Sequence, residues 1–339
     1  MTLPSHSLIT GMRMMVAGLI CFLTYQWMNW PEGYWSVVTV SAITQSMLSD
    51  TMVKAVLRFW GTCLGALVGL IFAYLIHDNL FWLSSIFLIF ITLTTYVGLQ
   101  TKPYQYASVV AGFTAVVVIA SKAMGNLQDI ALFRTLEVIF GIFVYAGVNL
   151  IVLSLQKDSD AFIAPRFKEK ISQVFKKIHW SSKSLIDTLI ISIPTTLTFL
   201  SWLIWKYPYG FWTTITLLII MEDSATDTEK KSFMRLIGQI LAASCGLLVA
   251  YYAGGDLLIT GIALAIGFFI SGCIIGSGSP IAGVGNHAGS AIAIMLLVGL
   301  KEGTTDVVLG RFFNVLAGIL IANLVMWLKT KIYPATALQ

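Results

Sequence analysis

The chain has 339 residues, of which 57% are hydrophobic and only 11% are charged, with a formal net charge of +5. One soluble core could not bury so much apolar surface, so the composition excludes an ordinary soluble domain and indicates a multi-span membrane protein. The period-two alternation of a membrane β-strand is absent.

Seven uncharged runs have about the length of a bilayer-spanning helix. They are Val16–Trp30, Cys63–Ile76, Leu80–Leu99, Ala107–Ala120, Val138–Leu155, Leu257–Ile275 and Val315–Leu328. Arg13 lies just before the first run, which ends in a Gln-Trp-Met-Asn sequence rather than a small-residue cleavage site. We therefore expect a retained span and not a signal peptide. The four cysteines lie in apolar runs without paired spacing, which favours core packing over metal or disulfide roles.

Two further segments are short and polar: Tyr34–Leu48, which contains Thr39 and Gln45, and Phe211–Met221, which contains Thr216. Each follows a Pro and a Gly, which suits a tight turn feeding a helix start. Short polar segments at matching positions of two halves indicate a transport site. The alternative is an ordinary span with a Trp and Tyr belt at the membrane interface.

The chain is a tandem duplication. A block of 44 residues, Pro31–Tyr74, occurs again as Pro208–Tyr251, 177 positions later. The same offset pairs Arg134 with Arg311 and Gly141 with Gly318, so the repeat covers nearly the whole chain. Internal repeats in an apolar chain typically build a transport path at their interface.

Basic residues flank equivalent spans in both copies, Lys54 and Arg58 in the first and Lys231 and Arg235 in the second. By the positive-inside rule both sets face the cytoplasm, so the copies are parallel and each has an even number of segments. We therefore predict an all-α integral membrane protein with two parallel six-segment repeats, about twelve transmembrane segments, and a pseudo-two-fold axis along the membrane normal. Both termini are expected in the cytoplasm.

The predicted boundaries are a first repeat over 1–156, a cytoplasmic linker over 157–183 and a second repeat over 184–339. In the linker, apolar residues recur at helical spacing opposite several lysines. This pattern predicts an amphipathic helix on the inner leaflet, where anionic lipid attracts it without a specific site. A nucleic-acid role has little support.

Four arginines related by the repeat are the main candidates for binding. We expect Arg58 and Arg235 near the inner ends of their helices and Arg134 and Arg311 near the outer ends. Arginine binds a carboxylate bidentately and stays charged, so the set favours an anionic permeant. Snorkelling to headgroups is an equal alternative for Arg58 and Arg235, whereas Arg134 and Arg311 oppose the positive-inside bias.

Other candidates break the symmetry of the repeat. Glu137 lies three residues after Arg134, but its counterpart is Asn314, so only the first half has this titratable group. Proton coupling and a structural ion pair are both possible roles. Gln45 and Glu222 are equivalent positions that either gate the inner mouth or cap a loop.

A Gly-rich stretch surrounds His287, which is either a titrating group or a packed histidine. Glycines here predict close helix packing or a broken, re-entrant segment. The stretch lacks the preceding strand of a dinucleotide loop. The chain shows no catalytic constellation, phosphate loop or metal-ligand cluster, so we expect no enzyme activity and no cofactor.

Gly33–Thr39 followed by Lys54–Ala66 resembles the signature of the fusaric acid resistance and aromatic acid exporter family. In that family a Tyr-Trp pair opens one span and an Arg-x-x-Gly-Thr-x-x-Gly-Ala stretch follows in the next. The second half keeps Trp212, Arg235, Gly238 and Gly246 but departs at Gln239 and Ala242. The plant aluminium-activated malate channels are similar in their six-span unit, which dimerises around a basic pore.

The resemblance implies an efflux component of the bacterial inner membrane for aromatic or other organic carboxylates, working with a periplasmic membrane-fusion protein. Many family members carry large cytoplasmic domains, whereas this chain has only its short linker. We expect the four arginines to attract the carboxylate and Trp35 and Trp212 to stack on an aromatic ring. An uncoupled anion channel and a non-transporting cell-envelope scaffold are the alternatives, and a homo-oligomer is possible.

Overall fold

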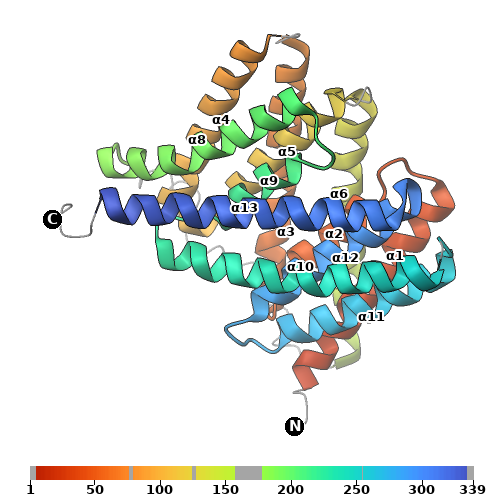
Figure 1. Cartoon of the computed structure of the whole chain (residues 1–339). Coiled ribbons are helices and arrows are strands. Elements are labelled where there is room, and N and C mark those ends of the chain that lie inside the picture. The colour runs from red at the N-terminus through yellow and green to blue at the C-terminus, as the bar shows by residue number, and fades with distance from the viewer. Residues whose placement is uncertain (1–4, 76–78, 124–126, 157–177, 254, 334–339) are drawn as a thin grey trace. The chain divides into compact units, whose positions relative to one another are not determined.

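The computed structural model describes residues 5–75, 79–123, 127–156, 178–253 and 255–333. Within these ranges the chain forms twelve α-helices, one 3-10 turn and no strand (Figure 1). The all-helical prediction is therefore confirmed. The amphipathic linker helix was predicted mainly within 157–177, outside the described residues.

The first repeat contributes six helices: α1 (Ser5–Met28), α2 (Tyr34–Ile43), α3 (Leu48–Leu75), α4 (Leu80–Gln100), α5 (Gln105–Ala123) and α6 (Leu127–Gln156), with the turn η1 (Lys102–Tyr104) before α5. The second contributes α8 (Ser182–Trp205), α9 (Phe211–Ile220), α10 (Ala225–Ala253), α11 (Leu257–Gly276), α12 (Ala282–Glu302) and α13 (Thr304–Ile332). The six-helix pattern thus recurs, with α1 and α8 beginning and ending 177 positions apart.

Nine of the described helices are long and apolar enough to span a membrane, whereas α2, α9 and the apolar part of α5 are shorter. The short segments of each repeat are confirmed as helices of 10 residues. At 1.5 Å per residue such a helix is only about 15 Å long, half the hydrocarbon thickness.

The long helices extend further than the uncharged runs indicated. α3, α6, α10 and α13 have 28 to 30 residues, because Arg58, Arg134, Arg235 and Arg311 lie inside helices rather than at their ends. Counting only uncharged residues therefore truncated these elements. The arginines lie 7 to 10 residues from the helix starts, or roughly 10–15 Å into each helix.

The chain folds into two compact units, and neither coincides with one repeat. Unit 1 comprises residues 1–59, 132–166 and 234–312, and unit 2 comprises 60–131, 167–233 and 313–339. In unit 1, α1 packs along α11 and α2 packs against α12. In unit 2, the equivalent pairs are α8 with α4 and α9 with α5. Each unit therefore joins the first two helices of one repeat to the fourth and fifth helices of the other.

Glycine contacts recur as well, here between the third and fifth helices of the same repeat. A Cβ on Gly61 would come within 2.8 Å of the Val110 Cβ in unit 2. Its counterpart Gly238 has the same relation to His287 in unit 1, at 2.7 Å. Close approach of helices at small residues, typical of membrane bundles, thus fixes equivalent contacts in both units.

Candidate functional site

All four arginines of the repeat lie in unit 1 and are buried. The Arg58 charge acts on Arg134, and the Arg235 charge acts on Arg311. The placement of the two members of each pair at different membrane depths stays a prediction, and each arginine lies 7 to 10 residues from the start of its helix. Unit 1 thus concentrates positive charge in its interior.

Arg134 contacts the aromatic residue predicted to bind a substrate ring. Its guanidinium carbon lies 3.5 Å from the centroid of the Trp35 ring, a cation–π contact in which both side chains are buried. Such contacts are strongest where water is excluded. Glu137 is also buried, and its charge acts on Arg134 as the spacing of three residues predicted. The charges that act on Arg134 therefore include two carboxylates, Glu32 and Glu137, and the Arg58 cation.

Trp35 and Thr39 belong to the short helix α2, which lies directly against α6. A Cβ on Gly141 would come within 2.5 Å of the Ser36 carbonyl oxygen and 3.1 Å of the Thr39 Cβ. In unit 2, Gly318 makes the equivalent contact, with 2.7 Å to the Thr216 Cβ. Thr39 and Thr216 are fully buried. The glycines therefore hold both short helices at backbone distance from a long helix.

The counterpart of Glu137 makes neutral hydrogen bonds in unit 2. Thr213 donates to the Asn314 side-chain oxygen at 3.2 Å, and the Asn314 amide donates to the Pro208 carbonyl at 3.1 Å. Asn314 thus joins α13 to the turn that precedes α9. Trp212, the counterpart of Trp35, is buried and lies beside the Phe211 ring.

Gln45 and Glu222 lie just after the ends of α2 and α9. At each position a threonine of the next helix accepts a hydrogen bond from the backbone between the two helices. The Gln45 backbone N–H donates to Thr51 Oγ1 at 3.1 Å, and the Glu222 N–H donates to Thr228 Oγ1 at 3.0 Å. The backbone geometry of the two breaks is therefore the same. Their side chains differ: the Gln45 amide donates to the neighbouring Thr44 carbonyl, whereas Glu222 enters a charged network.

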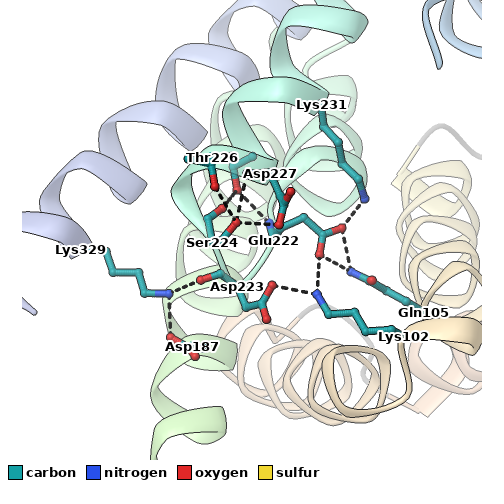
Figure 2. Close-up of polar contacts among 11 residues, drawn as sticks. Lys102, Gln105, Asp187, Glu222, Asp223, Ser224, Thr226, Asp227, Lys231 and Lys329 are labelled. Atoms are coloured by element: carbon teal, nitrogen blue, oxygen red, sulfur yellow. Dashed lines mark hydrogen bonds and ion pairs between the residues drawn. The ribbon is translucent and has the colours of Figure 1, made fainter. Parts of the chain in front are cut away.

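Figure 2 shows this network, which lies entirely in unit 2. The buried Glu222 carboxylate accepts hydrogen bonds from Gln105 at 2.8 and 2.9 Å, from Lys102 at 3.2 Å and from Lys231. Lys102 also pairs with Asp223 at 2.8 Å. Lys329 pairs with Asp187 at 2.7 Å and donates to the Asp223 carbonyl. We call the three lysines, the three acids and Gln105 the ionic cluster.

The ionic cluster perturbs its partly exposed members. Burial alone would lower the pKa of Lys102, but its hydrogen bonds and charge interactions with Asp223 and Glu222 raise it above the ordinary value. Burial alone would raise the pKa of Asp223, but the hydrogen bond and charge of Lys102 lower it. Both groups are therefore held in their charged forms.

Only one position of the ionic cluster keeps its charge in the other copy. Lys231 corresponds to Lys54, while Lys102, Gln105 and Glu222 correspond to Ser279, Ala282 and Gln45. The sequence singled out Glu222 but not its partners, which come from segments far apart in the chain. The signal in the sequence was the comparison of the two copies, in which Glu222 carries a charge and its counterpart Gln45 does not.

His287 lies in the continuous helix α12 and is partly buried. Of the two structures predicted for the Gly-rich stretch, close packing is the one observed: a Cβ on Gly285 would come within 2.4 Å of the Ser271 carbonyl oxygen. His287 itself packs against Gly238, three residues after Arg235 in α10. Among the described residues, no group of three His, Cys, Asp or Glu side chains could hold a metal ion.

The sequence model of the fusaric acid resistance protein-like family matches residues 19–148 and 195–325. The last residues of the two regions, 148 and 325, are 177 positions apart, as in the repeat. Together the two regions cover well over half of the chain. No curated protein and no solved structure matches the chain.

Proposed function

We propose that this chain, which belongs to the fusaric acid resistance protein-like family, exports aromatic or other organic carboxylate anions across the bacterial inner membrane. The observation that carries the proposal is the buried contact between Arg134 and Trp35. It combines, inside an apolar membrane protein, a cation that binds carboxylates with an aromatic surface.

The chemistry of this pair suits an aromatic acid. Guanidinium presents a planar fork of N–H donors that matches a carboxylate, and it remains charged at any physiological pH. An indole ring offers a face or an edge against which a second ring packs favourably. Arg58, Arg235 and Arg311 add positive charge in the same unit, which supports the entry of an anion.

We assign the substrate pathway to the predicted residues Trp35, Thr39, Gln45, Arg58 and Arg134 and to their counterparts Trp212, Thr216, Glu222, Arg235 and Arg311. Glu137 and His287 are the candidates for proton coupling. The proposed partner is a periplasmic membrane-fusion protein that receives the exported acid, and both chain termini lie in the cytoplasm. These assignments extend the family membership and the repeat pattern to the site.

The test is efflux of radiolabelled benzoate and phthalate from proteoliposomes of the purified chain, with protein-free liposomes as background. Saturable efflux of both acids, without saturable efflux of benzyl alcohol, is expected. Benzyl alcohol carries the ring without the charge and thus isolates the role of the arginines. If the rate of efflux does not depend on a proton gradient, and its direction is set by the anion gradient alone, the result would indicate the channel alternative. Absence of flux together with a tightly bound envelope protein would indicate the scaffold.

A further inference from the structure

Arg13 is a buried cation on the inward face of α1. The same helix exposes Leu8, Met12, Val16 and Ile20, a row of apolar side chains at helical spacing that a bilayer covers. Arg13 is only 7% exposed. It therefore points into unit 1, where α1 packs against α11 and α2.

The hydrogen bonds of Arg13 go to uncharged groups. Its Nη1 donates to Asn149 Oδ1 at 3.0 Å and its Nη2 donates to Thr10 Oγ1 at 2.9 Å, while Nε has no hydrogen-bond partner in the described ranges. No ion pair between Arg13 and a carboxylate occurs in that part of the chain. A guanidinium has five N–H donors, so most of its capacity to bind an anion is unused. Burying such a charge without a counter-charge costs several kcal/mol.

The fold does not require this cation. In unit 2 the counterparts of Arg13 and Asn149 are Ile190 and Met326. Both counterparts are apolar, and the same arrangement of helices forms without the cation, so Arg13 is an addition to unit 1 rather than part of the shared architecture.

A buried row of residues joins Arg13 to the Trp35 site. Asn149, Tyr145, Gly141 and Glu137 occupy every fourth position of α6, and the three with side chains are each 1% exposed. The Arg13 charge acts on the Tyr145 hydroxyl, and the Glu137 charge acts on Arg134. From Asn149 to Arg134 the row is about 22 Å long, most of a bilayer's hydrocarbon thickness.

We propose that Arg13, oriented by Asn149 and Thr10, is a second anion-binding site, which takes a carboxylate through its remaining N–H donors before the carboxylate reaches Arg134. The choice of a carboxylate rests on the proposed export function. The site itself rests on the buried guanidinium, its neutral partners and its absence from the other repeat.

Asn149→Asp tests the site with almost no change of shape. The new carboxylate lies where the amide oxygen now accepts from Arg13, so it forms an internal ion pair that competes with an added anion. A charge-assisted hydrogen bond contributes about 1.5–3 kcal/mol, so benzoate affinity should fall about tenfold or more. Equilibrium dialysis of benzoate against the detergent-solubilised full chain measures binding, and proteoliposomes measure export. Ile190→Gln, a polar change at the equivalent position, should alter neither.

Arg13→Gln should reproduce the loss of binding, and Arg13→Lys, which keeps the charge, should restore part of it. These two variants decide the matter if Asn149→Asp does not fold. Wild-type affinity in folded N149D or R13Q protein would overturn the site, even if N149D melts at a higher temperature, and would leave Arg13 as a structural cation near the end of α2. Wild-type protein that binds benzoate but does not export it would contradict the proposed function alone.

Discussion

The guanidinium carbon of Arg134 lies 3.5 Å from the centroid of the Trp35 ring, and both side chains are buried in unit 1. A desolvated contact of this kind contributes about 2 kcal/mol. Trp35→Leu should therefore lower both the thermal stability in detergent and the affinity for benzoate, whereas Trp35→Phe, which keeps an aromatic face, should lose less. Melting curves and equilibrium dialysis measure the two effects.

The control for this substitution is Trp60→Leu. It replaces the same type of side chain, but Trp60 is largely exposed on α3. A Trp60 variant that loses as much affinity as the Trp35 variant would show that the effect is not specific to the arginine contact.

Gly141 should not tolerate a side chain. Gly141→Ala places a methyl group within 2.5 Å of the Ser36 carbonyl oxygen, and overpacking of this kind costs about 1–3 kcal/mol. Gly147→Ala on the same helix is the matched control, since a Cβ there has no neighbour within 4 Å. Thermal unfolding should separate the two variants clearly. Equal melting temperatures would mean that α2 and α6 are not held at backbone distance.

The architecture could be predicted from the sequence in its local parts. Offset residues such as Pro31 and Pro208 established the repeat, and the short polar runs identified α2 and α9. The exchange of helices between repeats could not be predicted, because equivalent helices have similar apolar faces and either copy can complete a unit. Which copy does so depends on packing across the whole chain.

The site was predicted only where the repeat marked it. The four arginines and Trp35 recur at fixed spacing and were therefore visible. Arg13 has no counterpart, and its partner Asn149 lies 136 positions away, so no spacing joined them. The ionic cluster was not predicted either, because members such as Asp187 and Lys329 are far apart in the sequence and come together only in the folded chain.

The ionic cluster of unit 2 should stabilise the protein, whereas the equivalent positions in unit 1 should not. Glu222→Gln removes the buried carboxylate that Lys102, Lys231 and Gln105 share, and it should cost about 1–3 kcal/mol as charged hydrogen bonds are lost. The reverse change Gln45→Glu should not stabilise the protein, because Ser279 and Ala282 occupy the positions of Lys102 and Gln105. Denaturation in detergent at low and high salt would measure both. A stabilising Gln45→Glu would contradict the assigned asymmetry.

Stability should also depend on pH through the same cluster. The lowered pKa of Asp223 gives a contribution that is present above the ordinary aspartate pKa and is lost as pH falls through the lowered value. The raised pKa of Lys102 gives a contribution that is present below the ordinary lysine pKa and is lost as pH rises through the raised value. Asp223→Asn should therefore flatten the acidic side of a plot of melting temperature against pH, and Lys102→Gln the alkaline side. If both variants keep the wild-type dependence of melting temperature on pH, the pair of Asp223 and Lys102 does not contribute to it.

The central claim is that buried arginines of unit 1 carry a carboxylate across the membrane, and benzoate efflux from proteoliposomes of the Arg134→Gln, Arg311→Gln double variant tests it most directly. The account predicts efflux at the level of protein-free liposomes, from a protein that inserts and elutes as a single species like the wild type. Efflux at the wild-type rate from that variant would contradict the account.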